Sequence, residues 1–340
     1  MGKVTLQDVA DAVGVSRMTV SNAFNRPEKL SEALRARILE AAQDLGYGGP
    51  DPSARALARG RAGTVGLLLS DGLGEVFGDP VATEFLVAVG DELAKSSLAL
   101  TLVPTTGDHP DSRGDLPMDG AIVYVCGQGA ADIERLRSRG TPVVTVDQVP
   151  TDGVPSVNVD DRAGARAAAE HVVDLGHRRV GLVNLASTGT AENQPALQRN
   201  LGWRDALAAA GITPAEVRAD FRPAAGVHAA VRSLLEREDR PTALLCFSDV
   251  FAAQAVRAAD DLGLRVPEDL SVVGFDDASF AGTYRPALTT VRQRVGDKGR
   301  AAVDVLLASL AGEPVETLRR LLPTELVVRE STGPVPVPTT

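Results

Sequence analysis

The first apolar positions of the chain recur with the period of an α-helix. They follow the i, i+3, i+4, i+7 spacing of a single helical face and are Leu6, Val9, Ala10 and Val13. Thr5 and Asp8 form a Ser/Thr-x-x-Asp/Glu capping box, which predicts that this helix begins near Thr5. Gly14 predicts where the helix ends, because glycine is common just past a helix C-terminus.

A second helical pattern follows after one tight turn. Ser16 can cap it, and its apolar side contains Val20, Ala23 and Phe24. The opposite side carries hydrogen-bond donors and one flexible apolar residue, namely Arg17, Met18, Ser21, Asn22 and Asn25. Such a face is typical of a helix-turn-helix that reads the major groove of DNA. Any small helical hairpin could share the apolar pattern, so the pattern alone leaves both readings open.

The pattern then predicts a third helix and a short connecting segment. Ser31 can cap a helix over residues 32–45, which Gly46 ends. Helix breakers occupy residues 47–51, and residues 52–58 have a short helical pattern. Because an isolated helix needs about 12 to 15 residues to persist in water, we expect this segment to be ordered only when something docks against it. A plain linker is the alternative.

The rest of the chain alternates apolar runs with helical patterns such as residues 162–175 and 249–262. The strand-like runs cover residues 64–70, 98–104, 120–125, 142–147, 179–185, 242–248 and 270–276. Alternation of this kind predicts parallel sheets with helices on both faces. The number of units fits two Rossmann-like lobes better than one.

The segment from Val4 to Asn25, VTLQDVADAVGVSRMTVSNAFN, resembles the N-terminus of the LacI/GalR (lactose repressor type) transcription regulators nearly position by position. The resemblance continues through the body to LLPTELVVREST at residues 321–332. It implies an all-α helix-turn-helix head and an α/β body of two Rossmann-like lobes, periplasmic-binding-protein-like of type I. The expected domains are a DNA-binding head at 1–49, a hinge helix and linker at 50–63, an effector-binding and dimerisation domain at 64–332, and a tail at 333–340.

The resemblance also implies which residues contact DNA. In this family the hinge forms a helix only on DNA, and Leu57 is the expected wedge into the minor groove. Position 22 most often holds arginine in the family, so Asn22 changes one expected base contact. The residues expected to contact DNA are Thr5, Ser16, Arg17, Met18, Thr19, Ser21, Asn22, Asn25, Ser53, Ala54 and Leu57.

The charge of the chain is distributed unevenly. A formal net charge of -10 argues against a nucleic-acid partner, because phosphate binding depends on cationic side chains. Residues 1–61, however, hold nine Lys or Arg against seven Asp or Glu, whereas residues 62–340 hold 26 against 38. A weakly basic head on an acidic body directs the head toward DNA.

Polar side chains follow several predicted strands, at the edge where open α/β sheets bind ligands. Carboxylates, one arginine and an aromatic ring together suit a polyhydroxylated ligand. Arg199 in RNLGW, Asp276 in GFDD and Phe221 in ADF match effector-contacting positions of the resembled family. Each could instead serve as an ion pair, a helix cap or a core residue. The residues expected to bind the effector are Ser70, Asp147, Asp160, Arg199, Phe221, Ser248 and Asp276.

The sequence carries little that indicates catalysis. A glycine-rich segment at residues 72–78 follows a predicted strand, but its GxGxxxG spacing is one residue too long for a dinucleotide site, and we expect a flexible loop there. GxxxxGK-Ser/Thr, GxSxG and HExxH motifs are missing from the sequence. The cysteines and histidines have no metal-ligand spacing. We therefore expect no enzymatic activity, cofactor or metal.

These observations predict a repressor-type transcription regulator. It would bind a palindromic operator as a homodimer and respond to a small-molecule effector, a sugar or a related metabolite. The alternatives are a solute-binding protein, which needs a signal peptide, and a Rossmann-type cytoplasmic enzyme, which needs a phosphate loop or an acid and base pair. The sequence shows neither a signal peptide nor an apolar run of about 20 residues, so we expect a cytoplasmic protein without a membrane partner.

Overall fold

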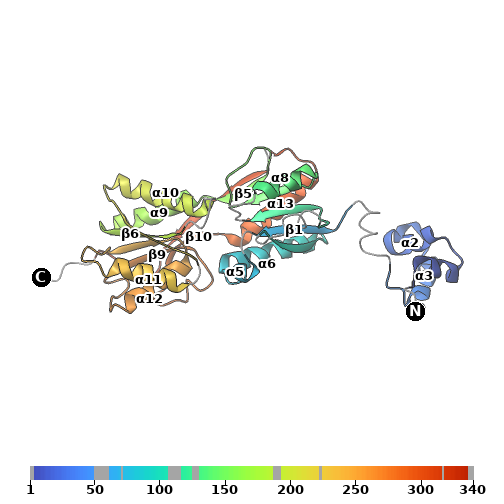
Figure 1. The fold of residues 1–340 in the computed structure, drawn as a ribbon, viewed down its shortest axis with the longest axis horizontal. Coiled ribbons are helices and arrows are strands. Elements are labelled where there is room, and N and C mark those ends of the chain that lie inside the picture. The colour runs from blue at the N-terminus through green and yellow to red at the C-terminus, as the bar shows by residue number, and fades with distance from the viewer. Residues whose placement is uncertain are drawn as a thin grey trace. The chain divides into compact units, whose positions relative to one another are not determined.

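The computed structural model describes residues 4–49, 61–69, 72–105, 116–124, 130–186, 193–221, 224–315 and 318–335. The chain forms two compact units, Met1–Gly63 and Thr64–Thr340, which are described separately below (Figure 1). Residues 50–60 lie outside the described part, and with them the predictions for the hinge helix and for Ser53, Ala54 and Leu57.

The N-terminal unit is a small helical head. Its elements are α1 (Leu6–Val13), α2 (Arg17–Asn25), the 3-10 turn η1 (Pro27–Lys29) and α3 (Glu32–Asp44). The predicted capping box at Thr5 and the predicted caps at Ser16 and Ser31 are all formed. Small apolar side chains fill the core, which consists of Val9, Ala10, Val20, Ala23, Ile38 and Ala42. Phe24 packs at the edge of this core, edge-on to Tyr47.

The larger unit contains two sheets of six strands each. The first has the strand order β11-β5-β4-β3-β1-β2 and comprises β1 (Thr64–Leu69), β2 (Ala99–Pro104), β3 (Gly120–Tyr124), β4 (Val143–Val146), β5 (Ser156–Val159) and β11 (Arg319–Leu322). The second has the order β12-β10-β9-β8-β6-β7 and comprises β6 (Val180–Leu185), β7 (Ala215–Ala219), β8 (Ala243–Cys246), β9 (Ser271–Asp276), β10 (Thr289–Gln293) and β12 (Thr324–Val327). Within the described residues, the strand pairs are parallel except β10 with β12.

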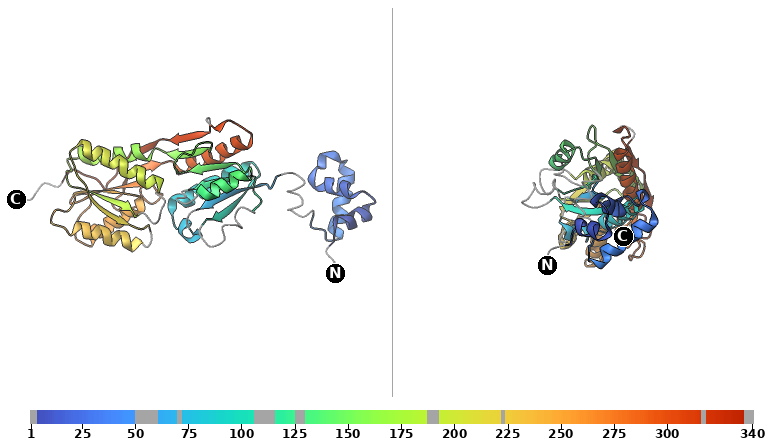
Figure 2. Two further views of the ribbon diagram at one scale, coloured as in Figure 1. Left: turned by 45° about the horizontal axis from the view of Figure 1, so that its top comes forward. Right: turned by 90° about the vertical axis from the view of Figure 1, so that its right-hand side faces the viewer.

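Helices cover both faces of each sheet and define two lobes (Figure 2). The first lobe carries α5 (Leu73–Val76), α6 (Pro80–Lys95), α8 (Ala130–Ser138) and α13 (Val295–Leu310). The second lobe carries α9 (Asp161–Asp174), α10 (Gln194–Ala209), α11 (Ala224–Leu235) and α12 (Asp249–Asp260). The chain passes between the lobes after β5, after β10 and after β11. The predicted fold class, a helical head plus two Rossmann-like lobes, is therefore confirmed.

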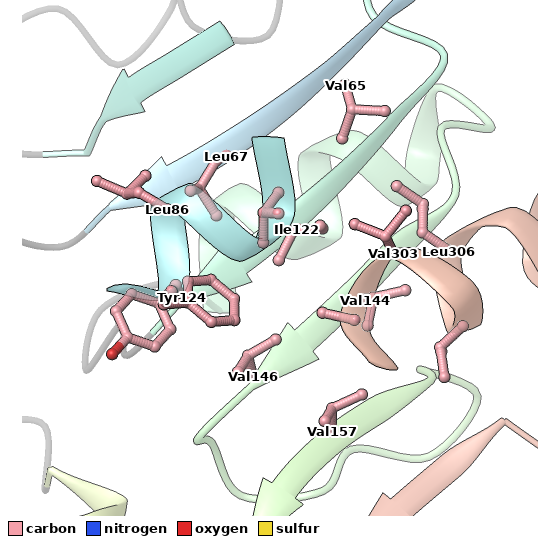
Figure 3. Packing of buried hydrophobic residues seen from close by; sticks show 14 of the residues in the cluster. Val65, Leu67, Leu86, Ile122, Tyr124, Val144, Val146, Val157, Val303 and Leu306 are labelled. Carbon is pink, nitrogen blue, oxygen red and sulfur yellow. The ribbon is translucent and has the colours of Figure 1, made fainter. Parts of the chain in front are cut away.

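The core of the first lobe lies between its sheet and the helices α6 and α13. Branched aliphatic side chains from β1, β3, β4 and β5 face Val303 and Leu306 of α13 (Figure 3). Close packing of the two helices depends on Gly299, because a Cβ there would lie 2.6 Å from the Cβ of Ala88 on α6. This packing places the first turn of α13 at the junction of the lobes.

The structure corrects one local prediction. The glycine-rich segment at residues 72–78 is not simply a flexible loop, since Gly72 begins the single helical turn α5 and Asp79 caps α6 directly after it. Three backbone hydrogen bonds close this turn, from Glu75, Val76 and Phe77. Asp79 accepts from the backbone N–H of Val81 at 3.0 Å, which fixes the start of α6.

Candidate DNA-binding surface and effector site

The head presents the N-terminus of α2 on its surface. Gly14 adopts a left-handed conformation with φ of 74°, which reverses the chain between α1 and α2. Arg17 is exposed, and Met18 is 69% exposed although it is apolar. An exposed apolar residue beside a cation at a helix N-terminus is the arrangement with which a recognition helix meets base edges.

Other polar residues of α2 are partly engaged within the head. The Ser16 hydroxyl accepts from the Thr19 backbone N–H at 3.1 Å and lies 2.8 Å from the Thr19 hydroxyl. Asn25 donates from its side chain to Ser21 at 3.2 Å. Thr5 donates its backbone N–H to Asp8, which lowers the pKa of that exposed carboxyl. The bonds of Ser16 and Asn25 restrain these side chains of α2 and its N-cap before any DNA is bound.

In the body, the guanidinium of Arg199 is buried in a cluster of charges and rings. It is only 4% exposed. Its Nε donates to Asp161 Oδ1 at 2.8 Å, and one terminal nitrogen donates to the carbonyl oxygen of Phe247 at 2.7 Å. The same nitrogen lies 3.2 Å from Asp276 Oδ1, and the guanidinium carbon lies 3.7 Å from the centre of the Phe275 ring. These contacts hold the guanidinium in a single orientation.

The RNLGW motif explains why Arg199 reaches this position. Gly202 lies one helical turn after Arg199 and faces α9, where a Cβ would be 2.2 Å from the carbonyl oxygen of Arg162. Only glycine allows α10 to approach α9 so closely. Trp203, 1% exposed, anchors the same helix in the core of the second lobe.

Hydrogen bonds continue from Asp276 to the first lobe. Gln293 donates from Nε2 to Asp276 Oδ1 at 2.7 Å and accepts from Lys298 Nζ at Oε1 at 2.8 Å. Lys298 also donates to Asp147 Oδ2 at 2.5 Å. The series therefore joins the end of β4 in the first lobe to the end of β9 in the second. Both aspartates have positive φ values, 55° for Asp147 and 114° for Asp276.

Carboxylates outnumber cations in this buried region. Burial raises the pKa of Asp161 to about 6, although the adjacent Arg199 opposes the shift. Burial likewise raises the pKa of Asp276, again against the effect of Arg199. Burial by itself would lower the pKa of Arg199, but Asp276 and Asp161 outweigh it and the pKa is raised. The cluster thus holds more acceptors than its own cations satisfy.

Comparison with known proteins places this geometry in a family. The profile of bacterial regulatory proteins of the lacI family matches residues 5–49, and that of a periplasmic binding protein-like domain matches residues 169–332. An HTH-type transcriptional regulator of Mycolicibacterium smegmatis is 35% identical, and the alignment covers 98% of this chain and 97% of the relative. The chain belongs to the lacI family of bacterial regulatory proteins.

Solved structures of lacI-family regulators share the whole architecture. The lac repressor dimer bound to operator and the anti-inducer ONPF aligns with a TM-score of 0.81 at 28% identity, covering 98% of this chain and 100% of that one. The complex of the transcriptional regulator CelR with cellobiose aligns with a TM-score of 0.72 at 29% identity, covering 96% and 99%. This chain is accordingly a DNA-binding helix-turn-helix transcriptional regulator.

The structure brings several of the predicted effector residues together and leaves others apart. Arg199, Asp276 and Asp147 belong to one hydrogen-bonded series with Gln293 and Lys298. Ser248 and Asp160 are helix N-caps, accepting from the backbone N–H groups of Phe251 and Ala163. Phe221 is half-buried and its ring centre lies 6.1 Å from that of Phe251, in the second-lobe core. Ser70 lies outside the described residues.

Sequence reasoning missed three members of this site. Lys298 and Gln293 lie outside the predicted strands and motifs, and Asp161 follows β5, a strand that the sequence did not predict, so no sequence signal marked them. A further buried carboxylate, Asp249, accepts from the Ala278 backbone N–H at 2.7 Å and from the Thr290 hydroxyl at 2.5 Å. Burial raises the pKa of Asp249 to about 8.

The described residues show no grouping of His, Cys, Asp and Glu that could hold a metal ion. Within the same part of the chain, every helix is too short or too polar to cross a membrane. Cys246 is a buried free thiol, and burial raises its pKa, whereas Cys126 lies outside the described residues.

Proposed function

We propose that this regulator is a repressor that binds a near-palindromic operator as a homodimer and is controlled by a neutral, polyhydroxylated effector, a sugar or a close relative. The effector would bind at the buried charge cluster, with Arg199, Asp276 and Asp147 as its main polar contacts. Because its DNA partner is bacterial operator DNA, the protein would act in the cytoplasm.

One observation carries the effector proposal, which is the excess of carboxylate acceptors around Arg199. Asp276 uses only Oδ1 toward Arg199 and Gln293, so its second oxygen is available to a ligand. Hydroxyl groups supply the donors that these carboxylates lack, whereas an anionic ligand would be repelled by them. The similar regulator CelR forms a complex with cellobiose, which supports a sugar as the effector.

The DNA proposal rests on the exposed face of α2. Arg17 can donate twice to a guanine edge, and Met18 can contact a thymine methyl group. Thr5, Ser16, Thr19, Ser21, Asn22 and Asn25 are proposed to complete the contacts with bases and phosphates. One recognition helix per chain and a two-fold operator imply a dimer, as in the lac repressor dimer on its operator.

Thermal-shift screening of the full chain against sugars, nucleosides and purines tests the proposal. A ligand that binds only the folded state raises its stability by RT ln(1 + [L]/Kd). We expect a sugar to raise Tm and to change the affinity for operator DNA in a titration. A hit confined to purines or nucleosides would overturn the sugar assignment, and a sugar that leaves DNA affinity unchanged would overturn its role as effector.

A further inference from the structure

Lys298 is a buried cation whose role neither the sequence nor the family resemblance indicates. It is 1% exposed on α13, among apolar neighbours that include Val295, Ala302 and Val303. A buried ammonium costs free energy unless it is paired and hydrogen-bonded. Its acceptors among the described residues are Asp147 Oδ2 and Gln293 Oε1. An aliphatic side chain would fill this position of α13 without that cost, so the charge needs an explanation.

Lys298 determines which way the amide of Gln293 points. Because the ammonium takes the carbonyl oxygen Oε1, the amide presents only its NH₂ group to Asp276. That group and Arg199 both contact Oδ1 of Asp276, at 2.7 Å and 3.2 Å. The other oxygen, Oδ2, receives no hydrogen bond from any described residue. Lys298 thus orients a second-lobe carboxylate through one intermediate side chain.

Lys298 orients a first-lobe carboxylate directly. It occupies Oδ2 of Asp147 and leaves Oδ1, which is buried and has no hydrogen-bond partner among the described residues. Leaving a buried acceptor unsatisfied costs free energy, which a donor from a ligand would recover. Asp147 and Asp276 also hold positive φ values, which are unfavourable for residues other than glycine. Each carboxylate is therefore held in place, and one of its oxygens accepts no hydrogen bond from the described residues.

We propose that Lys298 is a positioning residue of the effector site, and that it makes Asp147 Oδ1 and Asp276 Oδ2 the carboxylate oxygens that accept two hydroxyl groups of the effector. The inference rests on the proposed function, because it names two contacts of the same effector. Lys298 acts through the two aspartates and makes no contact of its own with the effector.

Single-hydroxyl analogues test this inference. The full chain is titrated by calorimetry with glucose, galactose, ribose, cellobiose, maltose and trehalose, and then with monodeoxy analogues of the tightest binder. In the wild type, removal of either hydroxyl that donates to these two oxygens weakens binding about 10- to 100-fold, as expected for hydrogen bonds to a charged group. In Lys298→Met, removal of either of these two hydroxyls weakens binding only about threefold or less. Removal of any other hydroxyl weakens binding as much as it does in the wild type.

Two further variants make the test specific. Gln293→Glu keeps the acceptor for Lys298 but removes the donor to Asp276. Removal of the hydroxyl that binds Asp276 then weakens binding less than in the wild type, whereas removal of the hydroxyl that binds Asp147 weakens it as much as before. This variant leaves the Lys298 contact with Asp147 in place, and it carries the test if Lys298→Met does not fold. Lys95→Met is the matched control, since Lys95 is an exposed lysine on α6 that forms an ion pair with Glu92. In Lys95→Met, removal of each hydroxyl weakens binding as much as it does in the wild type.

The outcomes separate this inference from the proposed function. A merely structural role for Lys298 would lower the fraction of active protein and leave the ratios between analogues unchanged, which would overturn the inference alone. The inference would also be overturned if removal of the two hydroxyls weakened binding in Lys298→Met and in Gln293→Glu as strongly as in the wild type. Failure of every sugar to bind the wild type would overturn the proposed function, and the inference with it.

Discussion

At the scale of single residues, the functional side chains are fixed by charge and by backbone strain. Arg199 and Asp276 could be found from the family resemblance, because short motifs mark both. Lys298 and Gln293 could not, since a lysine in an amphipathic helix and a glutamine at a strand end usually face solvent. Their positions follow from tertiary packing, which places the first turn of α13 beside Asp147.

Arg17→Ala tests the recognition face. We expect a loss of about 1 to 3 kcal/mol in operator binding, together with relaxed preference at one base pair, because a bidentate guanine contact is removed. Titrations against operators that vary at each position measure both effects. An equal loss on every sequence would make Arg17 a phosphate contact instead.

Asp276→Asn and Arg199→Ala should differ in a way that the structure explains. Asp276→Asn keeps an oxygen for Arg199 and Gln293, so we expect a folded protein that binds operator but no longer responds to the effector. Arg199→Ala leaves Asp161 and Asp276 buried without their cation, and we expect it also to lose about 3 to 5 kcal/mol of unfolding free energy. Denaturant unfolding and effector titration of both variants measure this difference. Full effector response in Asp276→Asn would contradict the site.

At the scale of elements, packing between helices aligns the site. Gly202 lets α10 lie against α9, and Gly202→Ala should therefore lose about 1 to 3 kcal/mol of unfolding free energy through overpacking. Gly226→Ala on α11 is the matched control, because its Cβ would meet open space. There we expect a gain of up to about 1 kcal/mol from helix propensity. Urea unfolding compares them, and equal effects would mean that the close approach does not constrain α10.

The C-terminal segment is tied to the second lobe by His177. This ring is fully buried, with Nδ1 2.9 Å from the Thr242 hydroxyl and Nε2 3.1 Å from both the Ser271 hydroxyl and the Gly333 carbonyl oxygen. Burial lowers the pKa of His177 from 6.5, although the Gly333 bond opposes the shift. A histidine with a lowered folded pKa stabilises the fold fully above its unfolded pKa and loses that contribution as the pH falls.

For His177 we predict how the difference in unfolding temperature between the wild type and His177→Gln changes with pH. His177→Gln should unfold at a lower temperature than the wild type at about pH 7.5, and the gap should narrow toward about pH 5.5 as the wild-type contribution is lost. Thermal unfolding of the two proteins at several pH values measures the gap. Subtraction removes the opposite pH dependence that the raised pKa values of Asp161 and Asp276 impose on both proteins. A gap that widens at low pH would contradict the assignment.

Which elements could be predicted from the sequence depends on their burial. The continuous apolar runs of β1, β3, β6, β8 and β9 mark strands whose residues are nearly all buried, and the structure confirms them. The strands β7, β11 and β12 were missed because they are half exposed and carry polar residues. β5 and β10 were missed because Asn, Thr, Arg and Gln interrupt short apolar patterns. Three of these missed strands, β5, β10 and β11, lead the chain from one lobe to the other.

At the scale of the whole molecule, two units with different charge carry out two tasks. The head, with its slight excess of basic residues, reads DNA, and the acidic body holds the site that we assign to the effector. Residues 50–63 join them, and we propose that effector binding acts on helix formation in this hinge, where Leu57 would wedge into the operator centre. A coupling of about 1 to 3 kcal/mol would change operator occupancy about 5- to 150-fold.

The most direct test of the account is selection of binding sites by the purified full chain from a library of random duplex DNA. We predict enrichment of a near-palindromic site with two half-sites related by a two-fold axis, because each protomer of a dimer presents one recognition helix. The centre should be a pyrimidine-purine step, which is the least costly step to unstack. Enrichment of a single asymmetric half-site, or of no sequence at all, would contradict the claim that this chain is a dimeric operator-binding regulator.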